Sequence, residues 1–109
     1  MNLTQLQQEI HQMAVQKGWW ETERNVGEML ALIHSEISEA LEEWRTGNPI
    51  GETYYSEGGK PEGFGVELAD AVIRILDVCE RYKIDLAHTI VEKMAYNAKR
   101  AYRHGGKLA

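Results

Sequence analysis

The sequence has little that would cross-link the chain, anchor it in a membrane or export it. It contains one cysteine, so no disulfide can form within the chain, and Cys79 stands in an apolar run, where we expect a small core residue. No run approaches the roughly 18 apolar residues of a membrane span. The polar residues 1–5 do not resemble a signal peptide. We therefore expect a cytoplasmic protein from a reducing compartment, with no membrane partner.

The sequence also has fewer basic than acidic residues. The 17 acids outnumber the 12 lysines and arginines, which gives a net charge of −5. This balance argues against a general binder of nucleic acid or of anionic membranes. The hydrophobic fraction of 43% is ordinary for a soluble globular protein. A length of 109 residues predicts a single domain, residues 1–109, with a modest core.

Strand patterns and internal repeats are missing, whereas helical periodicity is present in four segments. We therefore predict an all-α fold of about four helices. Thr4 with Gln7 is a capping pair that opens the first helix, and Gly18 ends it. Asn25 opens a second helix that runs to about residue 46, the third occupies residues 66–83, and Asp85 caps the last.

The third helical segment is the most unusual part of the chain. The apolar residues of 66–79 point in nearly every direction around a helix, so this helix has to be buried on almost all sides. A chain of this size is short for that task, and we expect a homo-oligomer to complete the bundle. Four charged residues nevertheless occupy one line of the helix at steps of three, four and three: Glu67, Asp70, Arg74 and Asp77.

Two helices each offer a pair of carboxylates at positions i and i+3. Glu36 and Glu39 form one pair, and Glu67 and Asp70 form the other. Packed side by side, the two helices would bring four carboxylates together, and a hard divalent cation relieves such repulsion. All-oxygen ligands favour Mg²⁺, with Mn²⁺ as a substitute and Ca²⁺ as a further possibility.

A structural interpretation of these acids stays open. Acidic pairs at this spacing also decorate solvated helix faces, and Arg74 is placed to pair with Asp70 or Asp77 as a neighbour on its own helix. Asp77 either pairs with Arg74 or joins a metal site, and we favour its pairing with Arg74. The apolar surroundings of Glu67 and Asp70 favour the metal site.

Three further features suit a nucleotide ligand. Lys93, Asn97 and Arg100 share one face of the last helix, where two cations and an amide suit phosphate oxygens. Trp20 is either a base-stacking residue or a core anchor. Residues 47–65 contain six of the ten glycines and both prolines and predict a long loop, either a mobile cover or a disordered segment. Residues 103–107 form a basic tail that either closes over phosphates or stays free.

Several short motifs together resemble a known family. The sequence SEISEALEE at residues 35–43, followed by Glu67-Leu68-Ala69-Asp70, resembles the EExxE…ExxD signature of MazG-like nucleoside triphosphate pyrophosphohydrolases. Residues 84–86 are similar to the segment that opens the last helix of that family. Residues 92–100 resemble its C-terminal KxxxNxxR segment. The likeness spans about residues 26–104, with the glycine-rich loop as an insertion and with Ser35 in place of the first glutamate.

The resemblance implies a MazG-like all-α fold, assembled as a dimer or a dimer of dimers. It implies Mg²⁺-dependent hydrolysis of a (d)NTP between the α and β phosphates, which yields (d)NMP and pyrophosphate. The metal ligands would be Glu36, Glu39, Glu67 and Asp70, with Glu36 or Glu39 also accepting a proton from water. The substrate contacts would be Lys93, Asn97, Arg100 and Trp20.

Two rival interpretations stay open at this point. One is a relative that acts on a particular nucleotide, such as a dUTP or dCTP pyrophosphatase or a phosphoribosyl-ATP pyrophosphohydrolase. The other is a non-catalytic helical dimerisation module, in which the acids are structural.

Overall fold

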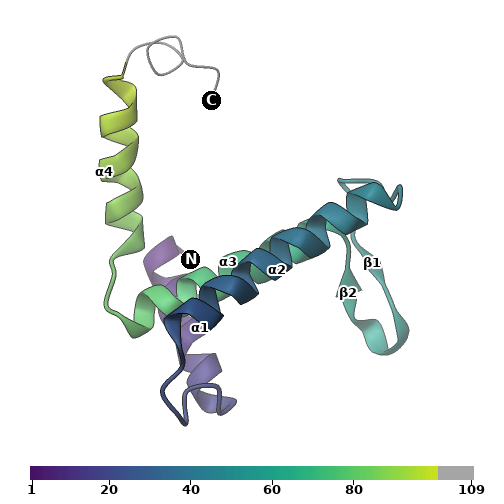
Figure 1. Cartoon of the computed structure of the whole chain (residues 1–109), viewed down its shortest axis with the longest axis horizontal. Helices are drawn as coiled ribbons and strands as arrows, with labels where there is room; N and C mark the ends of the chain where they lie inside the picture. The colour runs from purple at the N-terminus through teal and green to yellow at the C-terminus, as the bar shows by residue number, and fades with distance from the viewer. Residues whose placement is uncertain (101–109) are drawn as a thin grey trace.

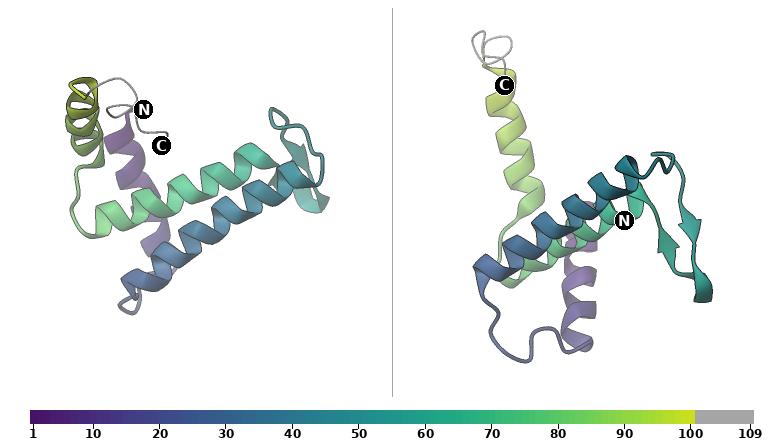
Figure 2. Two further views of the ribbon diagram at one scale, coloured as in Figure 1. Left: turned by 45° about the horizontal axis from the view of Figure 1, so that its top comes forward. Right: turned by 45° about the vertical axis from the view of Figure 1, so that its right-hand side comes forward.

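The computed structural model describes residues 1–100, and over this range it contains four α-helices, which confirms the predicted all-α class. They are α1 (Leu3–Gln16), α2 (Val26–Arg45), α3 (Phe64–Arg81) and α4 (Leu86–Ala98). Helices α2 and α3 lie side by side and antiparallel, α1 crosses α3 near one end of this pair, and α4 projects away from it (Figures 1 and 2). The basic tail at residues 103–107, for which a phosphate contact or a free end was left open, lies outside the described range.

The helix boundaries follow local capping chemistry. The predicted caps Asn25 and Asp85 are confirmed, since each side chain accepts a hydrogen bond from the backbone N–H three residues later. The predicted start at Thr4 is wrong. Asn2 forms the capping box with Gln5 instead, through bonds of 2.8 and 2.9 Å.

Gln7 has a tertiary role in place of the predicted capping role. Its side chain is 4% exposed, and its amide nitrogen donates to the backbone oxygen of Ile84 (2.8 Å) and to Glu80 (3.1 Å). The side chain therefore ties α1 to the end of α3, and the same contact secures the turn that leads into α4.

The connector between α2 and α3 is more regular than the predicted loop. It forms a short antiparallel hairpin from β1 (Tyr54–Tyr55) and β2 (Pro61–Glu62), with a single 3₁₀ turn η1 (Glu57–Gly59) at its tip. Tyr54 pairs with Glu62, and Tyr55 pairs with Pro61. Two-residue strands carry no readable alternation, so the sequence pattern could not show them.

The core lies where α1, α2 and α3 meet, and it is small. Its buried apolar residues in the described range are Met29, Ala40, Ala71, Leu76 and Cys79. The prediction for Cys79 is therefore confirmed. The prediction that α3 is buried on nearly all sides is not met within one chain, because Val72 is 46% and Ile73 is 45% exposed.

The four helices of the described residues do not include a membrane span. Within residues 1–100, none is long and apolar enough to cross a membrane.

Candidate functional site

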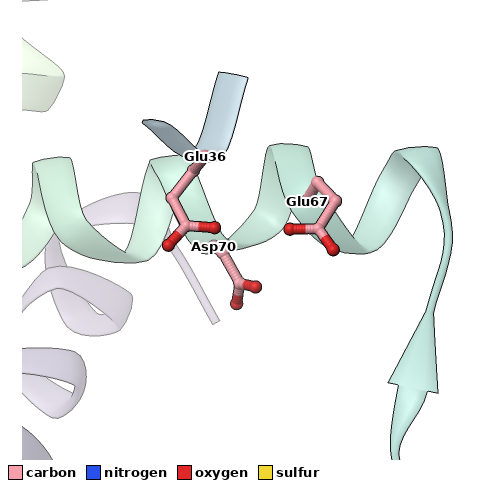
Figure 3. A group of neighbouring side chains, drawn as sticks. All are labelled: Glu36, Glu67 and Asp70. Atoms are coloured by element: carbon pink, nitrogen blue, oxygen red, sulfur yellow. The ribbon is translucent and has the colours of Figure 1, made fainter. Parts of the chain in front are cut away.

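Three carboxylates from two helices converge between α2 and α3. Glu36 comes from α2, and Glu67 and Asp70 come from α3 (Figure 3). One oxygen from each of the three lies within 4.8 Å of the others. Glu36 is buried at 8% exposure, and the other two are half-buried. The i, i+3 spacing on α3 puts Glu67 and Asp70 on one face, and the antiparallel pairing of the helices brings Glu36 to that face.

Glu67 has the most strongly perturbed electrostatics of the group. Desolvation, a hydrogen bond with Glu39 and the negative charges of Glu39 and Asp70 raise the pKa of Glu67 to about 7. Its Oε2 atom is buried and has no hydrogen-bond partner among the described residues. A buried carboxylate oxygen without a partner costs free energy, and a cation bound at this atom would offset that cost.

Glu39 contributes at the edge of the cluster. Its side chain is exposed and it lies close enough to Glu67 to affect that pKa, but it is not among the three residues whose oxygens converge. The structure therefore brings all four predicted acids into one neighbourhood, three at the centre and Glu39 on the solvent side.

Arg74 moderates the charge of the cluster from within α3. Its Nε donates to Glu36 Oε1 over 3.0 Å. The predicted pairing of Arg74 with Asp77 is replaced by this contact across the helix pair. Burial and the charge of Glu36 raise the pKa of Asp70, and the charges of Arg74 and Lys60 partly offset that rise.

Asp77 belongs to a separate polar network two turns along α3. Its Oδ1 lies 2.7 Å from His11 Nδ1, and its two oxygens accept the indole N–H of Trp20 at 3.0 and 3.1 Å. Arg24 lies 3.7 Å from Oδ2. This network holds α1 and the segment after it against α3.

Trp20 is thus packed as an anchor within the chain. Its ring meets His11 edge-on with centroids 5.6 Å apart, and the guanidinium of Arg24 lies 5.0 Å from its centroid. The structural alternative for Trp20 is realised here, and its contact with a base stays a prediction.

The predicted phosphate contacts are not brought to the acids within one chain. Lys93, Asn97 and Arg100 are exposed at the far part of α4, which projects away from the α2–α3 pair (Figure 1). Lys93 lies over the ring of Tyr96, with its Nζ 4.8 Å from the centroid.

Ser35, the departure from the family signature, does not face the cluster with its hydroxyl. Its Oγ donates to the backbone oxygen of Leu32 over 2.8 Å on the exposed side of α2.

The hairpin contributes residues that the sequence pattern did not single out. The Tyr54 hydroxyl donates to Glu43 Oε1 and Oε2 over 2.7 and 3.0 Å. That bond, with the charges of Glu43, Glu62 and Glu67, raises the pKa of Tyr54 to about 12. The adjacent tyrosines in a glycine-rich segment were the available signal, but nothing local indicated their partner.

Comparisons with models of known protein families, with curated protein sequences and with solved structures found no match.

Proposed function

We propose that the chain is a divalent-metal-dependent hydrolase that converts a (d)NTP to (d)NMP and pyrophosphate. Two observations carry this proposal together: the convergence of Glu36, Glu67 and Asp70, and a buried Glu67 oxygen that has no hydrogen-bond partner among the described residues. The donors are all carboxylate oxygens, which suits Mg²⁺ and, as a substitute, Mn²⁺. The EExxE…ExxD and KxxxNxxR resemblance points from a metal site to nucleotide chemistry.

The position of each carboxylate in the cluster indicates its proposed role. Glu36, Glu67 and Asp70 would hold the metal, with Glu39 completing the set from the solvent side. A bound divalent ion supplies charge neutralisation at phosphate oxygens and lowers the pKa of bound water.

Proton transfer falls to Glu39. Glu36 is buried and accepts a charge-assisted hydrogen bond from Arg74, whereas Glu39 is exposed to arriving water. In the reaction, the oxygen of water forms a bond to phosphorus, the α–β phosphoanhydride bond breaks, and the water proton passes to Glu39.

A screen of the common (d)NTPs with Mg²⁺ tests the proposed activity. We expect stoichiometric pyrophosphate and nucleoside monophosphate from at least one of them. Turnover of a single base would select the base-specific alternative. The absence of turnover with any nucleotide, phosphoribosyl-ATP included, would contradict the proposal and favour the non-catalytic module.

We further propose that the active form is a homo-oligomer in which α4 of one copy reaches the acidic cluster of another. In a single chain no residue of α4 is buried, and its apolar side chains Ile90, Val91 and Met94 are 41–65% exposed. The radius of gyration is 16.8 Å, against about 13 Å for a compact domain of this length. A second copy would cover these helices and place Lys93 and Arg100 near the phosphates.

Mixed oligomers test this arrangement. A Glu67→Gln chain lacks the cluster, and a chain with Lys93→Ala and Arg100→Ala lacks the basic face. If α4 acts between copies of a dimer, an equal mixture that is unfolded and refolded together regains about one quarter of wild-type activity, because half the dimers are mixed and each has one intact site. If both act within one chain, the mixture stays as inactive as its components, and that result would contradict the shared site.

A further inference from the structure

Arg74 contacts the acidic cluster of Glu36, Glu67 and Asp70 directly. Its Nε donates to Glu36 Oε1 over 3.0 Å, and among residues 1–100 no other ion pair includes a carboxylate of the cluster. The side chain of Glu36 is 11% exposed, and that of Arg74 is 37% exposed. A charge-assisted hydrogen bond is stronger in such a partly desolvated setting than in water. The contact therefore restricts how the Glu36 carboxylate can rotate.

This hydrogen bond joins the two helices that build the cluster. Glu36 is the one ligand of the three that comes from α2. Arg74 lies one turn after Asp70 on α3, so it shares the helix face that carries Glu67 and Asp70. A pairing of Arg74 with Asp70 would have left the α2 carboxylate free to turn. The observed bond instead fixes Glu36 relative to the two carboxylates of α3.

The bond also limits what Glu36 can offer to a metal ion. Because Arg74 holds Oε1, Glu36 is arranged to bind an ion through a single oxygen. A carboxylate that binds one ion through both oxygens suits the large, irregular coordination shell of Ca²⁺. Mg²⁺ demands a near-ideal octahedron, which ligands with one oxygen each can form. The contact therefore favours Mg²⁺ and the similar Mn²⁺ over Ca²⁺.

We propose that Arg74 is a positioning residue that makes the cluster selective for Mg²⁺ over Ca²⁺ by holding one oxygen of Glu36. This assignment rests on the proposed function, because it requires a divalent ion at the cluster. Arg74 acts here through Glu36 and not through contact with the reacting atoms. Its charge repels both divalent ions alike, whereas its hydrogen bond affects them differently, so the ratio of the two affinities reports the bond.

Two substitutions separate the hydrogen bond of Arg74 from its charge. Glutamine and arginine share the same three-carbon stem, so Arg74→Gln places an amide nitrogen at the position of Nε. This variant keeps a donor and loses the charge. Arg74→Met has a similar shape up to that position and lacks both, and Arg74→Leu, which also lacks the donor, replaces it if Arg74→Met does not fold. Arg45→Gln is the control for removal of an exposed arginine, since the Arg45 side chain on α2 is 66% exposed.

The test measures the melting temperature of each chain over a range of Mg²⁺ or Ca²⁺ concentrations at pH 8, which gives an affinity for each ion. The wild type, Arg74→Gln and Arg45→Gln are expected to bind Mg²⁺ more tightly than Ca²⁺. In Arg74→Met the ratio of Ca²⁺ affinity to Mg²⁺ affinity is expected to rise about tenfold over that in Arg74→Gln, because Glu36 can then offer both oxygens.

The possible results distinguish the role of Arg74 from the metal site itself. The same affinity ratio in Arg74→Gln and Arg74→Met would overturn the role of the hydrogen bond and leave the metal site in place. Tighter binding of Ca²⁺ than of Mg²⁺ by the wild type would also overturn it. If neither ion raises the melting temperature of the wild type, the metal site of the proposed hydrolase and the role of Arg74 are overturned together.

Discussion

Replacement of Glu67 by glutamine is expected to reduce the rate of pyrophosphate release about a thousandfold. Glutamine preserves the size of the side chain but removes the charge of one of the three converging carboxylates. A divalent ion contributes several kcal/mol to stabilising the charge of the transition state, and each 1.36 kcal/mol corresponds to a factor of about ten in rate. Steady-state kinetics at saturating Mg²⁺ measure the loss.

Stability distinguishes this effect from simple unfolding. In metal-free buffer near neutral pH, Glu67→Gln is expected to melt at or above the wild-type temperature, because the substitution removes a desolvated charge that repels Glu39 and Asp70. Glu42→Gln is the matched control, since Glu42 lies on the same helix as Glu36 with its side chain 64% exposed. Wild-type rates in Glu67→Gln, or an equal loss in Glu42→Gln, would contradict the assignment.

Replacement of Asp77 by alanine is expected to have the largest effect on stability. The Asp77 side chain is 10% exposed and contacts the polar groups of His11, Trp20 and Arg24. Its removal leaves a half-buried indole N–H without an acceptor and a half-buried guanidinium without its counter-ion, which costs about 3 kcal/mol in the free energy of unfolding. For a domain of this size, the melting temperature falls by about 12 °C or more.

Calorimetric melting at equal protein concentration measures this loss. Asp77→Asn keeps an acceptor for Trp20 and is expected to lose less, and Glu92→Gln on the exposed part of α4 is expected to change little. A shift of less than about 3 °C in Asp77→Ala would show that the network contributes little to holding α1 against α3.

The helices could be predicted because their signals are local. Asn25 and Asp85 cap the helices that follow them through contacts three residues away, and apolar spacing identifies the rest. The start of α1 was misplaced because two capping pairs of the same type overlap, and the tertiary contacts of Gln7 decide between them.

The convergence of the acids was also accessible from sequence. Each i, i+3 pair fixes one helix face, and burial of the apolar stripes turns those faces towards each other. The partners of the charged residues were not accessible. Arg74 bonds to Glu36 across the pair, and Asp77 bonds to His11, which is 66 residues away in the chain. Such contacts depend on how α2 packs beside α3 and on how α1 crosses α3, and no local pattern encodes either arrangement.

The strands of the hairpin and the contacts of α4 could not be predicted from the sequence either. The strands of the hairpin are two residues long, so the glycine-rich composition indicated a loop and concealed the bond from Tyr54 to Glu43. The sequence also indicated an apolar and a basic face on α4, but no described residue of α4 is buried, so the partners of these faces stay a prediction.

The central claim is that a divalent ion binds among Glu36, Glu67 and Asp70, and pH-dependent melting tests it most directly. The pKa of Glu67 is raised from 4.5 in its reference state to about 7 in the folded chain. The folded state therefore holds this proton more tightly than the unfolded chain. The corresponding stability is fully present below pH 4.5 and is lost as the pH rises through about 7. Metal binding requires the ionised carboxylate, so the stabilisation by Mg²⁺ increases as the pH rises.

The decisive measurement is the melting temperature with and without saturating Mg²⁺, at pH 5 and pH 8, for the wild type and for Glu67→Gln. The account predicts that Mg²⁺ raises the wild-type melting temperature by several degrees at pH 8 and far less at pH 5, and that Glu67→Gln loses most of the rise at pH 8. If Mg²⁺ does not change the melting temperature of the wild type at pH 8, or if it raises that of Glu67→Gln by the same amount, the account is contradicted.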